Sequence, residues 1–268
     1  MLANQGVELG GITEHVGVRA MTQEIMQVSP LPPSMMKALQ EADYIVHDHT
    51  HIQDPGALSK VTALIGTGAA KVDKQLLSML PNLKLVAICG VGYDGVDVAA
   101  CKEKGIAVTH TPGVLTDDVA DMAMGLVLSM GRRIPQADKF VRQGDWVDDE
   151  FPLRNKVSGT RMGIVGMGRI GRAIAKRAAA FDMRIAYTGR VAKADVPYVF
   201  YETVTQLAAN VDYLVIAVPG GDDTKHMIGA SVLQALGSKG YLINIARGSV
   251  VDQPVLVQAL KDKTIAGA

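Results

Sequence analysis

The sequence is short of several residue types, and each shortage disfavours a class of protein. Only two cysteines, Cys89 and Cys101, occur among 268 residues. One lies in an apolar run and the other in an expected helix, which favours a reduced cytosolic protein over a disulfide scaffold. The 27 basic and 27 acidic residues cancel, so the charge excess that would favour binding to nucleic acid or to an anionic membrane is missing.

Long hydrophobic runs are also missing. No stretch approaches the roughly 18 uninterrupted apolar residues that a membrane-spanning helix needs. The first residues have neither the basic head nor the apolar centre of a signal peptide. Met21 precedes the first run typical of a strand, so residues 1–20 are predicted to be an extension outside the fold. These features together predict a cytoplasmic protein with no membrane partner.

Short β-rich runs alternate with helical patterns along the rest of the chain, an order typical of parallel sheets with crossover helices. In the first series, strands are expected at 24–28, 44–47, 61–66, 84–88 and 106–109, and helices around 34–41, 73–80 and 96–104. In the second series, strands are expected at 161–166, 183–188, 213–219 and 241–246, again with helices between. The two series predict two α/β domains, each with its own core.

A long helix is predicted between the two series, in TDDVADMAMGLVLSMGRRI. Thr116 and the acids after it suit the free amides of a helix start, and Arg132 and Arg133 suit its end. Apolar residues recur at helical spacing and predict one buried face. They are Val119, Met122, Ala123, Leu126 and Met130. Both a spine between domains and an ordinary buried helix fit this pattern.

The motif GIVGMGRIG, residues 163–171, predicts a dinucleotide site. Gly166, Gly168 and Gly171 form GxGxxG between an apolar strand and a helix. The first glycine permits the tight turn, the second lets the backbone approach a pyrophosphate, and the third lets the helix pack on the strand. The helix start then presents free amides to the phosphates. A glycine-rich turn without a ligand is the alternative.

The end of the next strand, AYTGR, indicates which dinucleotide is bound. In NAD sites this strand usually ends in an acidic residue that binds the adenosine ribose hydroxyls. Here Thr188 is followed by Gly189, which leaves room, and by Arg190, a permanent cation suited to a 2′-phosphate. NADPH is therefore the expected cofactor, with NAD as the alternative. Arg190 as a solvated loop residue is the competing interpretation.

Four segments in order resemble the D-isomer-specific 2-hydroxyacid dehydrogenase family. They are CGVGYDGVD (89–97), TPGVLTDDVAD (111–121), GIVGMGRIG (163–171) and INIARGSVVDQPVLVQAL (243–260). TGR at 188–190 looks most like the NADPH-dependent glyoxylate and hydroxypyruvate reductases. The resemblance implies an α/β fold of two doubly wound parallel-sheet domains, with a flavodoxin-like substrate domain at 21–110 and a Rossmann NAD(P)-binding domain at 111–268.

The resemblance also implies roles for single residues. Val91 and Gly92 correspond to backbone amides that hold the substrate carboxylate, and Arg247 to the catalytic arginine that grips the carboxylate and polarises the keto oxygen. The expected cofactor-binding residues are Gly166, Gly168, Arg169, Ile170, Gly171, Thr188, Gly189, Arg190, Val218, Pro219, Ile245 and Ala246. Without the resemblance, a purely structural turn at 91–92 and a structural ion pair at Arg247 are the alternatives.

The expected function is reduction of a small 2-keto acid, glyoxylate or hydroxypyruvate, to the D-2-hydroxy acid by hydride transfer from NADPH. One rival is an NAD-dependent relative acting on another 2-hydroxy acid, such as a phosphoglycerate. Another is a nucleotide-sensing protein without catalysis. The resemblance further suggests a homodimer formed through the nucleotide domain. Trp146 is expected either in that interface or in the core.

Two groups of the family mechanism are not found in the 268 residues. The family places a glutamate just after a segment like IAGA and a histidine further on, in a Pro-His pair. A truncated sequence is therefore expected, in which both domains lack their C-terminal parts and catalysis is crippled although NADPH still binds weakly. The histidines of YIVHDHTH, residues 44–51, share one side of an extended segment. A metal face is one interpretation and a polar loop the other; because the family needs no metal, none is predicted.

Overall fold

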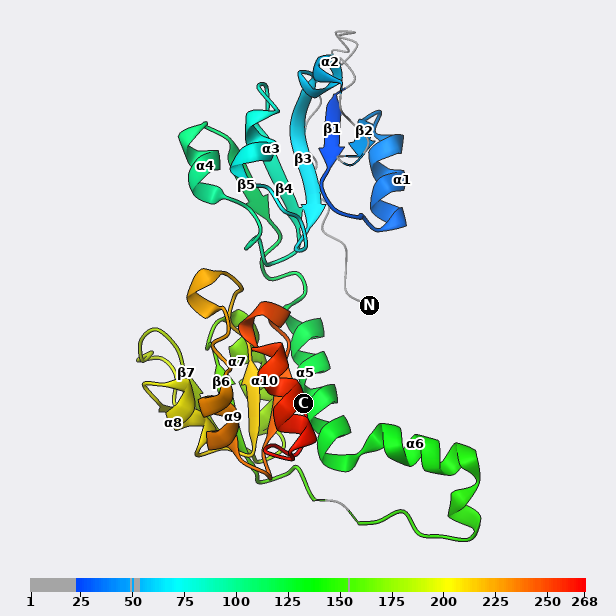
Figure 1. The fold of residues 1–268 in the computed structure, drawn as a ribbon, viewed down its shortest axis with the longest axis vertical. Coiled ribbons are helices and arrows are strands. Elements are labelled where there is room, and N and C mark those ends of the chain that lie inside the picture. Colours follow the sequence, from blue (N-terminus) through cyan, green and yellow to red (C-terminus); the bar gives the residue numbers. More distant parts are fainter. Residues whose placement is uncertain (1–22, 49, 51–53, 154) are drawn as a thin grey trace, which may run out of the picture.

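The computed structural model describes residues 23–48, 50, 54–153 and 155–268. These residues form two parallel sheets of five strands each, arranged one above the other along the long axis of the molecule (Figure 1). The predicted α/β class with two doubly wound sheets is confirmed. The expected extension at 1–20 and two of the three clustered histidines, His49 and His51, lie outside the described residues.

The first sheet carries the order β2-β1-β3-β4-β5, which is the flavodoxin-like order. Its strands are β1 (Glu24–Gln27), β2 (Ile45–Asp48), β3 (Val61–Thr67), β4 (Leu85–Cys89) and β5 (Ala107–His110). Its helices are α1 (Pro33–Glu41), α2 (Pro55–Leu58), α3 (Lys74–Ser78) and α4 (Val98–Glu103). Val61, Leu64 and Val86 are fully buried between the sheet and these helices. We call this part of the chain the upper unit.

The second sheet carries the order β10-β9-β6-β7-β8, the Rossmann order with its reversal between β6 and β9. Its strands are β6 (Arg161–Val165), β7 (Arg184–Thr188), β8 (Val199–Phe200), β9 (Tyr213–Ile216) and β10 (Tyr241–Asn244). Its helices are α7 (Arg169–Ala179), α8 (Val204–Ala208), α9 (Ala230–Leu236) and α10 (Gln253–Lys261), with short 3-10 turns η2 (Asp222–Thr224) and η3 (Gly248–Val250). We call this part the lower unit.

Two strands of the lower unit end earlier than expected. β9 stops at Ile216 rather than at 219, and β10 stops at Asn244 rather than at 246. The residues that follow leave the sheet at its carboxyl edge, where ligands bind in open α/β sheets. The apolar runs continue past the last ladder hydrogen bonds because these residues line a cavity rather than a strand.

The long helix between the units, α5 (Thr116–Arg132), differs from its prediction at its start and on its buried face. Its cap position is Leu115, and no side chain caps it, so the hydroxyl of Thr116 does not serve as the helix cap. The buried residues are Ala120, Ala123, Met124, Val127 and Gly131. Met122 is 61% exposed and Leu126 38%. The inner face packs against α7 and combines the small Ala120 and Ala123 with Met124 and Val127, whereas Met122 and Leu126 lie on the outside.

A helical arm that the sequence did not predict follows α5. It consists of α6 (Ile134–Gln143) and the 3-10 turn η1 (Asp145–Val147), and it extends away from both sheets (Figure 1). No residue of α6 is buried. Trp146 is 61% exposed, so the core position considered for it is wrong.

A partly exposed ion pair and a buried tyrosine lie at the amino-terminal edge of the lower sheet. Asp212 accepts hydrogen bonds from Arg161 at 2.7 Å and 3.1 Å. This contact, above all, holds the pKa of the Asp212 carboxyl below its ordinary value. Burial raises the pKa of the neighbouring Tyr213 phenol to about 12. Both groups lie far from the carboxyl edge of the sheet and serve stability.

Candidate active site

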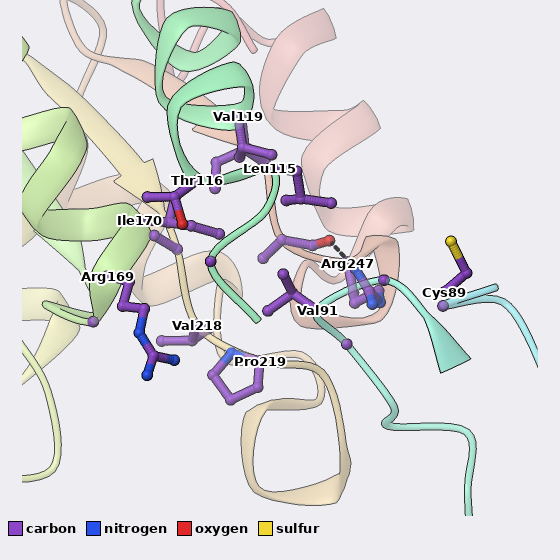
Figure 2. A pocket seen from close by; sticks show the side chains of 18 residues that line it. Cys89, Val91, Leu115, Thr116, Val119, Arg169, Ile170, Val218, Pro219 and Arg247 are labelled. Atoms are coloured by element: carbon purple, nitrogen blue, oxygen red, sulfur yellow. Dashed lines mark hydrogen bonds between the residues drawn. The ribbon is translucent and has the colours of Figure 1, made fainter. Parts of the chain in front are cut away.

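A cavity lies where the two units face each other. It has a volume of about 500 Å³ and is lined by loops from both sheets. Ten of the predicted site residues line it: Val91, Gly92, Gly168, Arg169, Ile170, Val218, Pro219, Ile245, Ala246 and Arg247. Figure 2 shows Cys89 and Val91 entering from the upper unit, and Arg169, Val218, Pro219 and Arg247 from the lower unit. Residues far apart in the sequence therefore share one concave space.

The glycine-rich turn has the geometry that a pyrophosphate site requires. Gly166 has a φ of +100°, which side chains rarely adopt, and a Cβ there would lie 2.7 Å from the carbonyl oxygen of Ala217. A Cβ on Gly171 would collide with the carbonyl oxygen of Gly166, so α7 rests directly on the turn. At Gly168, by contrast, nothing lies within 4 Å of an added Cβ. No side chain caps α7, so its first amides are available to an anion.

The remaining predicted cofactor residues lie at the end of β7. Thr188 is buried, and its carbonyl oxygen accepts the Gly166 amide at 2.9 Å. A Cβ on Gly189 would meet nothing within 4 Å. The Arg190 side chain is 86% exposed, and its Nη2 lies 3.3 Å from Asp223 Oδ2. The strand end thus offers open space next to an accessible cation.

The turn after β4 exposes backbone amides to the cavity. Within the described part of the chain, neither the Val91 nor the Gly92 amide has a hydrogen-bond partner. His110 Nδ1 lies 3.0 Å from the carbonyl oxygen of Val91, and its ring contacts Tyr93 edge-on. These contacts support the turn that carries the two amides.

Arg247 brings the positive charge to the same place. Its Nη1 donates to the carbonyl oxygen of Ala246 at 3.0 Å, and its Nη2 lies 3.1 Å from Asp94 Oδ1. Asp94 lies in the segment CGVGYDGVD, residues 89–97. Its role was not predicted, because the sequence of a glycine-rich loop does not show where a single acidic side chain points. Cys89 and Thr116 also line the cavity and were not predicted to do so.

No group of acidic, histidine and cysteine side chains suited to a metal is found among the described residues. Of the clustered histidines, His47 is described, and its Nε2 lies 2.7 Å from Glu24 Oε2. No helix of the described residues is long and apolar enough to cross a membrane. Both cysteines are free thiols.

The family model for the D-isomer-specific 2-hydroxyacid dehydrogenase NAD-binding domain matches residues 124–268. A glyoxylate/hydroxypyruvate reductase A of Arabidopsis thaliana is 50% identical over 210 residues, which are 78% of this chain and 67% of that protein. A hydroxyphenylpyruvate reductase of Plectranthus scutellarioides is 49% identical, over 78% of this chain and 66% of that protein. The chain thus spans about two thirds of the length of these relatives.

Solved structures agree with the sequence comparisons. An NADPH-dependent glyoxylate/hydroxypyruvate reductase of Sinorhizobium meliloti, in complex with NADP and malonate, superposes with a TM-score of 0.85 at 40% identity. The match covers 92% of this chain and 78% of that one. It therefore includes both units and the loops that enclose the cavity.

Proposed function

The chain belongs to the D-isomer-specific 2-hydroxyacid dehydrogenase family, and we propose that it binds NADPH and reduces glyoxylate or hydroxypyruvate to the D-2-hydroxy acid. The observation that carries this proposal is the cavity between the units. The glycine-rich turn, a pair of free amides and a guanidinium all line it, each from a different loop. Relatives named as reductases of these acids support the choice of substrate.

The residues present fit a dinucleotide. The open space at Gly168 and the uncapped start of α7 suit the pyrophosphate, and Ile245 and Ala246 are proposed to line the nicotinamide. When bound, the nicotinamide supplies the hydride for reduction. The chain's own residues then bind and orient the acid: Val91 and Gly92 donate amide hydrogen bonds to its carboxylate, while Arg247 stabilises the charge that develops on its carbonyl oxygen. The accompanying proton is expected from the histidine that follows the IAGA segment in the family.

Arg190 is proposed to select NADPH over NADH. It already contacts Asp223, but both side chains are more than 80% exposed, and such a pair contributes only about 0–1 kcal/mol. A dianionic 2′-phosphate offers more acceptors and more charge than one carboxylate, so it displaces Asp223 readily. Gly189 leaves the room that this phosphate needs.

Calorimetric titration of the chain with NADPH and NADH tests the cofactor assignment. Wild type is expected to prefer NADPH, and Arg190→Ala to lose at least about tenfold in NADPH affinity, about 1.4 kcal/mol, with NADH affinity unchanged. Arg184→Ala is the matched control, because it removes the same charge at the opposite end of β7. A preference for NADPH that survives in Arg190→Ala would show that the 2′-phosphate is not recognised there.

Turnover tests the reaction and separates it from its rivals. The chain, and a version extended by the family's glutamate and Pro-His pair, are assayed for NADPH oxidation with glyoxylate, hydroxypyruvate, hydroxyphenylpyruvate and phosphohydroxypyruvate. The extended version is expected to reduce the two small acids much faster than the 268-residue chain. Equal rates for both versions contradict the proton donation proposed for that histidine. Absence of turnover in both, with NADPH bound, favours a nucleotide-sensing protein.

We also propose a homodimer formed through the arm. Seven exposed large apolar side chains lie on the outer face of α5, on α6 and in the segment after it. They are Met122, Leu126, Ile134, Val141, Trp146, Val147 and Leu153. In a two-fold dimer each arm covers the outer face of α5 in its partner, so one patch meets its own copy. Gel filtration is expected to give a dimer for wild type and a monomer for Val147→Asp. Val199→Asp, which alters an exposed valine on β8, is the control and stays dimeric.

A reducing compartment, the cytoplasm, is proposed for the chain because both thiols are free. Cys101 is fully buried, and burial raises its pKa. It therefore stays protonated and unreactive.

A further inference from the structure

One ion pair joins the two units inside the cavity. Asp94 belongs to the loop between β4 and α4 of the upper unit, and Arg247 follows β10 of the lower unit, 153 positions later. Asp94 Oδ1 lies 3.1 Å from Arg247 Nη2 and 3.2 Å from Nε, and Asp94 Oδ2 lies 3.3 Å from Nε. The carboxylate thus faces one edge of the planar guanidinium, the arrangement that fixes an arginine most firmly.

Two glycines leave the space that this ion pair occupies. A Cβ on Gly92 would collide with Arg247 Nη2, so the turn that offers the free amides closes directly onto the guanidinium. A Cβ on Gly220 would lie 2.6 Å from Asp94 Oδ2 and 2.8 Å from Arg247 Cγ. Glycine backbone from the upper unit and from the lower unit therefore packs against the pair. Gly220 directly follows Pro219, one of the residues assigned to the cofactor.

The ion pair with Asp94 leaves some N–H donors of the Arg247 guanidinium without a partner in the described part of the chain. Nε and one N–H of Nη2 face Asp94, and one N–H of Nη1 is bound by the Ala246 carbonyl oxygen. A guanidinium has five N–H donors, so one on Nη1 and one on Nη2 remain for a ligand. Because Asp94 and the Ala246 carbonyl hold the plane at two separate points, the free donors keep one direction.

We propose that Asp94 is the positioning residue for Arg247: it reaches across the cleft, fixes the guanidinium against the Val91–Gly92 amides, and so couples closure of the two units to recognition of the substrate carboxylate. The inference rests on the proposed function, because it assigns Arg247 to that carboxylate. Asp94 touches neither substrate nor cofactor in this scheme and acts only through Arg247.

Binding of oxalate, a two-carbon dicarboxylate similar to glyoxylate, measures this role without turnover. Calorimetry on the NADPH-saturated chain compares wild type, Asp94→Ala, Asp94→Asn and Glu41→Ala. The last is the control, since it removes an exposed ion pair with Lys37 in the same unit. Asp94→Ala is expected to weaken oxalate binding at least about tenfold and Asp94→Asn about threefold, because the amide keeps one acceptor. NADPH affinity is expected to stay within about twofold of wild type in every variant.

A double-mutant cycle separates positioning from a merely structural role. If Asp94 acts through Arg247, Asp94→Ala weakens oxalate binding much less in an Arg247→Lys background than in wild type, because lysine has no plane to orient. Equal effects in both backgrounds overturn the inference. Thermal unfolding of each variant is followed in parallel, and if Asp94→Ala does not fold, Asp94→Asn carries the same cycle.

The outcomes also distinguish the inference from the function on which it rests. If the wild-type chain with NADPH shows no oxalate binding at all, the assignment of the cavity to a 2-keto acid is wrong. If wild type binds oxalate and both Asp94 variants bind it within about twofold, Asp94 does not position Arg247, and the proposed function stands without it.

Discussion

Replacing Gly168 by alanine is expected to weaken NADPH binding without lowering stability. Gly168 has φ −81° and ψ −161°, an extended conformation that alanine adopts without strain, and the new Cβ meets nothing within 4 Å. The unfolding free energy is therefore expected to stay equal to wild type or to rise by up to about 1 kcal/mol. The same methyl group points into the space proposed for the pyrophosphate. We expect NADPH affinity to fall at least about tenfold, which is about 1.4 kcal/mol.

Gly171→Ala is the matched comparison, because the opposite result is expected for stability. Its Cβ would collide with the Gly166 carbonyl oxygen and lie 3.3 Å from Ile164 Cγ2. Neither the backbone atom nor the buried side chain has room to move, so α7 is pushed away from β6. Overpacking of this kind costs about 1–3 kcal/mol. NADPH affinity falls as well, because the start of α7 moves.

Urea unfolding gives the stabilities and calorimetry gives the affinities of both variants. A Gly168→Ala variant that binds NADPH within about twofold of wild type would refute the proposed approach of the pyrophosphate to this backbone. A Gly171→Ala variant as stable as wild type would refute the close packing of α7 on the turn. Each failure points to a different step of the reasoning.

Three further predictions concern stability. Leu214→Ala is expected to cost about 2–5 kcal/mol in urea unfolding, because Leu214 is fully buried in the lower core; a smaller loss contradicts tight packing there. Because the pKa of Asp212 is lower in the folded state than in the unfolded state, its carboxylate contributes to the unfolding free energy above the unfolded pKa of about 4. This contribution is lost as the pH falls through the pKa of the folded state. Asp212→Asn is therefore expected to be about 1 kcal/mol less stable than wild type at neutral pH, with the difference vanishing in acid; a constant difference refutes the linkage. The pKa of Tyr213 is raised from 10.0 to about 12 in the folded state. The stability that its neutral phenol contributes is therefore fully present below pH 10.0 and is lost as the pH rises towards about 12. Tyr213→Phe is expected to be less sensitive to alkali, and unfolding curves across this range check it.

Local patterns were enough to place most elements and the glycine-rich turn. Alternating β-rich runs and helical runs yield the two sheets, because short apolar segments between turn residues have few other ways to be buried. GxGxxG between a strand and a helix predicts the turn at 166–171, because each glycine is needed for a contact with residues that are near it in the sequence. The predicted ends of β9 and β10 lie two or three residues beyond the observed ends. The sequence does not distinguish apolar residues that line a cavity from apolar residues of a strand.

The buried face of α5 shows why periodicity alone misleads. Apolar residues occur on two sides of this helix, and the side that contacts α7 is the one that turned inward. Ala120 and Ala123 allow α7 to approach closely, whereas Met122 stays outside. The spacing of apolar residues along a helix does not show which element the helix packs against. The arm was missed because its apolar residues pack against neither sheet, so no residue of α6 is buried.

The sequence by itself determined the fold class, the glycine-rich turn and the presence of a cation beside it, since these depend on neighbours within about twenty residues along the chain. The family resemblance implied that Val91, Gly92 and Arg247 bind one carboxylate, and the tertiary structure brings the three residues into one cavity. The tertiary structure alone paired Arg247 with Asp94 across 153 positions. Contacts between units depend on how two separate sheets face each other. No local pattern encodes that arrangement, so it has to be read from the structure.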